Sequence, residues 1–125
     1  MINLQHALLV LIGSAVGGGL RFFISSIIQQ GLITKFPLGT FAVNIIGCFV
    51  MGLVFGFADK NTSMQLNITL LLATGFCGGF TTFSAFAYEN LILIKHQSSL
   101  LALAYIFLSV TVGILCVKWG MSIIK

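Results

Sequence analysis

The sequence has 125 residues, of which 58% are hydrophobic and only 6% are charged. Soluble domains carry about one-quarter charged residues, so this composition excludes water as the main solvent and indicates an integral membrane protein in lipid. The six basic and two acidic residues are too dispersed for a nucleic-acid patch, a catalytic triad or a carboxylate pair, so we expect no enzyme.

Four apolar segments follow in chain order, each long enough for the helix of about 20 residues that crosses a bilayer. They cover about residues 7–28, 38–58, 66–94 and 99–123. The polar stretch 59–63 predicts a turn at the membrane surface. The loops are too short for a second domain, so residues 1–125 are predicted to form one four-helix transmembrane domain. The N-terminus lacks the basic region of a secretory signal, so we expect Met1 to be the mature start.

The third segment is too long for a simple span and is predicted to break near its centre. Small and hydroxyl residues gather there: Gly75, Gly78, Gly79, Thr81 and Thr82. Helix breaks at membrane depth persist only where protein or water satisfies the freed backbone groups, so they tend to mark binding sites. Close helix packing is the alternative, because small residues at this spacing recur as Gly13/Gly17, Gly52/Gly56 and Gly75/Gly79. Packing explains the first two pairs, whereas the hydroxyls beside the third favour a break.

The basic residues are balanced between the two ends of the spans. Four spans place both termini and the second loop on one side of the membrane. That side has Lys60, Lys118 and Lys125, and the other has Lys35, Lys95 and Arg21. Because an excess of Lys and Arg sets orientation, a balanced chain can insert both ways and pair with an inverted copy. We predict an antiparallel, dual-topology homodimer; the alternative is a weak bias hidden by so small a count.

Polar side chains inside the spans are costly unless they face a partner or water. Arg21 lies in the last third of the first span, where it either reaches a vestibule or extends to the interface. Thr40 and Asn44 are one turn apart and share a face of the second span. The Asn44 amide can donate to an anion, although a bond between helices is the ordinary use of a membrane asparagine.

Aromatic and hydroxyl residues come directly after the predicted break. Phe83 and Phe86 are one turn apart, interleaved with Thr82 and Ser84. Phenylalanines at this spacing usually pack in a core or against lipid. A phenyl ring is positive at its edge, however, so ring edges beside hydroxyls can meet a small anion without the trapping strength of a fixed cation.

The fourth span adds Tyr105 and Ser109 one turn apart, with Thr111 on a different face. Glu89 is expected near a membrane end, which leaves no carboxylate at mid-span. These residues favour an uncharged polar track over a proton-coupled carboxylate site. The cysteines, interpreted as buried structural thiols, are Cys48, Cys77 and Cys116.

Three stretches carry a family resemblance: residues 18–22 (GGLRF), 39–47 (GTFAVNIIG) and 75–86 (GFCGGFTTFSAF). With the length, the four spans and the charge balance, they resemble the CrcB or Fluc family of dual-topology fluoride channels over the whole chain. The resemblance implies an antiparallel homodimer with two pores in the inner or plasma membrane. It also implies passive, electrogenic export of fluoride from the cytoplasm.

The resemblance also implies roles for individual residues. Phe83 and Phe86 would line the fluoride path, Asn44 would donate a hydrogen bond to the ion, and Arg21 would attract anions at a vestibule. The carbonyls of Gly78 and Thr81 would hold a structural Na⁺ at the dimer interface. Further path residues are implied less directly: Thr40, Thr82, Ser84, Tyr105, and Ser109 or Thr111. Ala85 departs from the pattern, because the family places a hydroxyl there.

Two other functions compete with the channel. A small four-span exporter of drugs or cations can also be dual-topology, but such exporters place an essential Glu in the first span, and this span has no acid. A membrane scaffold held together by its small-residue faces predicts no conductance and leaves Asn44, Phe83 and Phe86 with packing alone. The fluoride channel is therefore the function that we expect.

Overall fold

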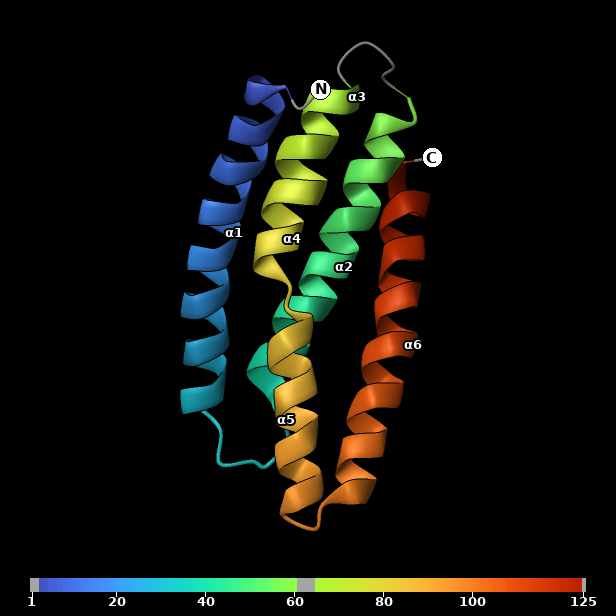
Figure 1. The fold of residues 1–125 in the computed structure, drawn as a ribbon. Coiled ribbons are helices and arrows are strands. Elements are labelled where there is room, and N and C mark those ends of the chain that lie inside the picture. The colour runs from blue at the N-terminus through green and yellow to red at the C-terminus, as the bar shows by residue number, and fades with distance from the viewer. Residues whose placement is uncertain (1–2, 61–64, 125) are drawn as a thin grey trace.

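The computed structural model describes residues 3–60 and 65–124 as a bundle of long helices (Figure 1). Helix α1 covers Leu4–Gln30, α2 covers Leu38–Ala58 and α6 covers Ser99–Ile124. The third span, Gln65–Lys95, consists of α3 (Gln65–Ile68), η1 (Thr69–Cys77), α4 (Gly78–Phe80) and α5 (Phe83–Lys95). Four helices in this part of the chain are long and apolar enough to cross a membrane, which confirms the predicted all-α membrane architecture.

Local sequence signals explain where the helices begin. The Asn3 side chain accepts a hydrogen bond from the Gln5 amide at 3.0 Å, and this N-cap starts α1 ahead of the predicted 7–28. Pro37 directly precedes α2, where its missing N–H costs no helical bond, and α2 covers the predicted 38–58. Three predicted features lie outside the described residues: the start at Met1, residues 61–63 of the surface turn, and Lys125.

Helices α2 and α6 lie side by side and meet along a glycine contact that we call the α2–α6 seam (Figure 1). A methyl group on Gly52 would collide with the backbone of Val117. A methyl group on Gly120 would collide with the backbone of Phe49. Small residues therefore bring the two backbones together, which is how membrane helices gain packing energy in a solvent as apolar as their side chains.

Helix α1 packs against the third span in a similar way. A methyl group on Gly13 would meet the Phe76 amide at 2.7 Å, and one on Gly79 would meet the Ser14 carbonyl oxygen at 2.6 Å. The pair Gly75 and Gly79 therefore lies in a close contact with α1. This corrects the expectation that the third glycine pair marks the break rather than packing, because the interruption itself comes just after it.

The third span is interrupted at Thr81 and Thr82, so the predicted break is confirmed. Thr81 has φ −88° and ψ 161°, and Thr82 has φ −149° and ψ 121°, both extended backbone. The Thr82 hydroxyl oxygen accepts from the Ala85 amide at 3.2 Å and caps the new helix α5. Before the interruption, η1 is a π-helix, a form that is rare and is found mostly at functional sites.

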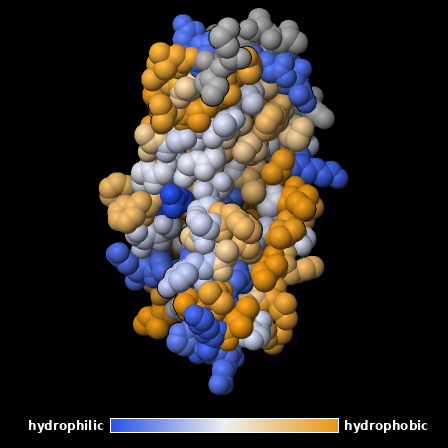
Figure 2. Space-filling view, viewed as in Figure 1, coloured by the Kyte–Doolittle hydropathy of each residue, from blue (hydrophilic) through white to orange (hydrophobic). Residues whose placement is uncertain are grey.

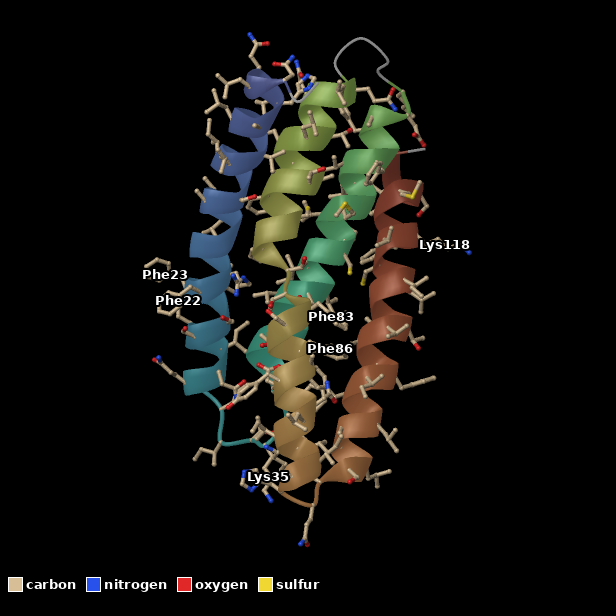
Figure 3. The ribbon with its side chains drawn as sticks, viewed as in Figure 1. Phe22, Phe23, Lys35, Phe83, Phe86 and Lys118 are labelled. Atoms are coloured by element: carbon tan, nitrogen blue, oxygen red, sulfur yellow. The ribbon has the colours of Figure 1, made fainter. Side chains whose placement is uncertain are left out.

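In Figure 2 apolar side chains lie mainly along the sides of the bundle, residues of intermediate hydropathy cover much of the middle, and hydrophilic residues lie at both ends and at isolated points between them. Large exposed apolar residues such as Phe22 and Phe107 suit contact with lipid. Helix α1 begins and α6 ends at the same end of the bundle (Figure 1), whereas Lys35 lies at the other end (Figure 3). This arrangement is that of a multi-pass membrane protein with four spans.

Candidate functional site

Asn44 connects α2 to the break through two hydrogen bonds. Its Nδ2 donates to the Thr82 carbonyl oxygen at 3.1 Å, and its Oδ1 accepts from the Thr82 amide at 2.7 Å. The asparagine side chain thus supplies the acceptor that an interrupted helix cannot give to the Thr82 amide, and it adds a second bond to the Thr82 carbonyl. These two bonds use one of the two amide hydrogens of Asn44, because a primary amide carries two.

The break redirects the amides that would normally pair with two carbonyls. The amide four residues after Gly78 belongs to Thr82, and it donates to Asn44 instead. The amide four residues after Thr81 belongs to Ala85, and it donates to the Thr82 hydroxyl oxygen. The carbonyls of Gly78 and Thr81 are therefore released from the helical pattern, and carbonyl oxygen is a suitable ligand for a hard cation such as Na⁺.

A cavity of about 440 Å³, which we call the break cavity, opens beside this interruption. Asn44, Thr82, Phe83, Phe86 and Ser109 all line it, so five predicted path residues from three spans come together. The Ser109 Oγ is buried and has no hydrogen-bond partner among the described residues. The rest of the lining is mostly apolar: Gly47, Cys48, Met51, Thr81, Val110 and Val117. The cavity therefore combines a few polar groups with aromatic walls.

The two phenylalanines project from α5 (Figure 3). Their ring centroids are 5.8 Å apart, with 41° between the ring planes. Phe86 also packs edge-on against Tyr105, with the centroids 4.9 Å apart and the planes at 65°. Phe83 is 78% exposed, so the packing of a single chain does not depend on its ring.

The carboxylate of Glu89, on α5, is hydrogen-bonded to side chains of two other helices, which the sequence did not predict. Thr40 Oγ1 donates to Glu89 Oε1 at 2.5 Å, and the buried Tyr105 hydroxyl donates to Oε2 at 2.9 Å. Thr40 lies in the first turn of α2, so this contact is close to the end of that span, and the expectation that Glu89 lies near a membrane end stays a prediction. Thr40 and Glu89 also line a second cavity of about 400 Å³, which includes Lys35.

Besides Thr40, Gly78 and Tyr105, three further predicted site residues lie outside the break cavity. Arg21 of α1 donates through Nε to the Gly79 carbonyl oxygen at 3.0 Å, just before the interruption. Ser84 is exposed, with its hydroxyl 3.3 Å from that of Thr82. Thr111 is exposed on α6 and lines neither cavity, so Ser109 is the α6 hydroxyl that reaches the site.

Residues 8–121 match the family described as "CrcB-like protein, Camphor Resistance (CrcB)". A relative from Methylobacillus flagellatus is 41% identical over 123 residues, which cover 98% of this chain and 96% of the relative. One from Gloeothece citriformis is 42% identical over 118 residues, which cover 94% of this chain and 95% of the relative. One from Flavobacterium psychrophilum is 39% identical over 116 residues, which cover 93% of this chain and 94% of the relative. Each of these relatives is named "Fluoride-specific ion channel FluC".

Proposed function

The chain belongs to the CrcB-like protein family, and from this membership we propose that it is a fluoride-specific ion channel. A channel of this kind is not an enzyme. Transport is passive and electrogenic, so the ion follows its concentration gradient and the membrane potential. A potential that is negative inside drives the anion outward, and the channel thereby lowers intracellular fluoride.

The observation that carries the proposal is the content of the break cavity. Fluoride is strongly hydrated, so a narrow path must return its hydrogen bonds as water is lost. The second amide hydrogen of Asn44 and the Ser109 hydroxyl, which has no partner among residues 3–60 and 65–124, supply donors in that cavity. The ring edges of Phe83 and Phe86 add weakly positive contacts. The path thus solvates an anion without a fixed cation that would hold it.

Other polar groups extend this path on either side of the cavity. Thr82 and Ser84 add hydroxyls at the start of α5, 3.3 Å apart. Thr40 and Tyr105 continue the polar groups toward the second cavity through their bonds to Glu89. The two terminal amino groups of Arg21 attract anions toward a vestibule.

A structural Na⁺ belongs to the proposal because the break provides the right ligands. The carbonyls of Gly78 and Thr81 would hold the ion, since the amides that normally pair with them are engaged elsewhere. Bound there, a monovalent cation supplies positive charge that neutralises the partial charges of backbone oxygens. The ion is structural rather than transported.

The working unit that we propose is an antiparallel homodimer. Phe83 is 78% exposed in one chain, and an exposed aromatic ring beside a polar cavity is suited to cover by a second copy. Lys35 and Lys118 project at different levels of the bundle (Figure 3), in keeping with the balanced basic residues. The multidrug exporter has less support, because α1 contains no acid.

Fluoride efflux from liposomes tests the function. Vesicles containing the purified protein are loaded with potassium fluoride or potassium chloride, and efflux is followed with and without a K⁺ ionophore. We expect rapid fluoride efflux that requires the ionophore, with no chloride efflux. Chloride efflux of equal rate, or no fluoride efflux from a folded protein, contradicts the proposal.

A pair of phenylalanine variants ties the function to the break cavity. Phe83→Ile removes the ring edge, and we expect fluoride efflux to fall at least about tenfold in a protein that stays folded. Phe22→Ile is the matched control, because Phe22 is 66% exposed on α1 and projects away from the bundle (Figure 3). Equal efflux from the two variants removes Phe83 from the path.

A further inference from the structure

One face of α1 provides polar contacts to the third span at two levels. Ser14 Oγ donates to the Gly75 carbonyl oxygen at 3.3 Å, and two turns later Arg21 Nε donates to the Gly79 carbonyl oxygen at 3.0 Å. Gly17 lies between them, with no space for a side chain against Phe76. Since α1 is held this closely to the third span, both donors have a fixed position relative to the backbone that they contact.

The two accepting carbonyls differ in what else satisfies them. The Gly75 carbonyl lies in a continuous stretch of helix and also accepts the Gly78 amide. The amide four residues after Gly79 belongs to Phe83, which opens α5 beyond the extended backbone of Thr82. The Gly79 carbonyl has therefore lost its usual helical donor to the break, and Arg21 replaces it. A freed carbonyl at membrane depth costs several kcal/mol without such a partner.

The hydrogen bond to Gly79 comes from Nε of Arg21 and not from a terminal amino group of the guanidinium. Because the bond uses Nε, the two terminal amino groups of Arg21 are not required for it, and the guanidinium can hold the backbone and face an anion together. Asn44 holds Thr82 from the opposite side of the break. The interruption is thus fixed between α1 and α2 by one side chain on each.

We propose that Arg21 is a positioning residue, whose Nε–H holds the Gly79 peptide and thereby fixes the direction of the neighbouring carbonyls and the start of α5. This role rests on the proposed channel function for its effect on flux, and it is separate from the attraction of anions by the positive charge. On this proposal, the channel requires the position of the Arg21 N–H donor and does not require the charge of its side chain.

Three substitutions separate the donor from the charge. Arg21→Gln removes the charge but keeps an N–H donor at the same number of bonds from the backbone as Nε. Arg21→Lys keeps the charge but moves the donor one atom further out, and Arg21→Met keeps the length without a donor. Fluoride efflux is measured at low ionic strength and at about 1 M of an impermeant salt, where charge effects fade beyond about 3 Å.

For flux, we expect Arg21→Gln to approach wild type at high salt, while Arg21→Lys and Arg21→Met stay at least about tenfold lower at both salt concentrations. Ser14→Ala is the control for a lost α1 donor, and it should conduct normally because Gly75 keeps its helical partner. Lys118→Gln is the control for a lost charge, and it should conduct normally because Lys118 lines neither the break cavity nor the second cavity. The proposal is overturned in favour of charge alone by two results together. Arg21→Lys conducts fluoride at the wild-type rate, and Arg21→Gln conducts less than wild type at low salt but equals it at high salt.

Hydrogen–deuterium exchange gives a readout that needs no fluoride transport. We expect the amides of residues 80–84 to exchange about tenfold faster in Arg21→Lys and Arg21→Met, and at the wild-type rate in Arg21→Gln and Lys118→Gln. Unchanged exchange in Arg21→Met, or equal acceleration in Arg21→Gln, overturns the positioning role. A wild-type protein that conducts no fluoride defeats the proposed function, while this comparison still decides the role of Arg21.

Discussion

The α2–α6 seam and the break in the third span show two different ways of joining membrane helices. At the seam, Gly52 and Gly120 let backbone meet backbone, with atoms that are apolar or already paired within helices. At the break, Arg21 donates to the Gly79 carbonyl, which has lost its helical donor, and Asn44 pairs with both the amide and the carbonyl of Thr82. The first arrangement stabilises the bundle through packing, and the second satisfies polar groups that would otherwise be unpaired in lipid.

The difference indicates that stability and transport depend on different parts of the bundle. A continuous helix hides its backbone and offers an ion nothing to bind. An interrupted helix exposes carbonyls and amides, and the side chains needed to satisfy them bring polar groups to mid-membrane. Substitutions at the seam should therefore act on stability, and substitutions at the break on flux.

The largest effect on flux is expected at Asn44. Asn44→Ala removes both bonds to Thr82 and leaves the amide of this break residue without its partner, a cost of about 1–3 kcal/mol. Asn44→Asp keeps the acceptor but loses the donor and puts a negative charge beside the path. We expect fluoride efflux to fall at least about a hundredfold in both variants.

Asn90 provides the matched control for this prediction. It is also a buried asparagine, 6% exposed, but its Nδ2 donates at 2.9 Å to the Phe86 carbonyl oxygen within its own helix. Asn90→Ala should keep most of the efflux, measured in the same liposome assay. If Asn90→Ala and Asn44→Ala lose efflux equally, contact with the break is not what distinguishes Asn44.

A substitution at the α2–α6 seam should lower stability rather than fluoride flux. Gly120→Ala places a methyl group 2.9 Å from the Leu53 amide and against other backbone atoms of α2, so the helices must move apart. We expect a loss of about 1–3 kcal/mol in the free energy of unfolding, measured by denaturation in detergent. Gly19→Ala is the control, because nothing lies within 4 Å of the added methyl, and helix propensity should stabilise it by up to about 1 kcal/mol.

A smaller effect is expected where the two regions meet, at the hydroxyl of Tyr105. Tyr105→Phe keeps the ring against Phe86 but removes one of the two donors to Glu89. A hydrogen bond contributes about 0.5–1.5 kcal/mol, and the loss should appear in the free energy of unfolding together with a modest fall in efflux. Tyr88→Phe should change neither, since Tyr88 is 65% exposed.

The four spans and the break could be predicted from the sequence because each depends on local composition. Apolar length gives the spans, and the glycines and threonines of the third segment give the interruption. The hydrogen bonds of Glu89 could not be predicted in this way, because their donors are hydroxyls of α2 and α6 that only the folded bundle brings together. One signal was available: Glu89 is one turn after Phe86 and so continues toward the same interior.

The contacts of Asn44 and Arg21 could not be predicted from local composition either. Sequence patterns identified both as polar residues inside spans, and the family resemblance implied that both face the anion. Their bonds to Thr82 and Gly79 depend on which carbonyls the break releases. That information belongs to the packing of three spans, and no spacing within one segment contains it.

The smallest effect is expected in the turn that connects the broken span to α6. Gln97 has φ 57°, a left-handed conformation in which a side chain is strained and glycine is not. Gln97→Gly should therefore raise the free energy of unfolding by less than about 1 kcal/mol and leave fluoride efflux unchanged. Gln97→Val should lower stability, because a β-branched residue fits this region poorly. A change in efflux for Gln97→Gly would mean that this turn transmits strain to the break, and the separation of stability from transport would then be incomplete.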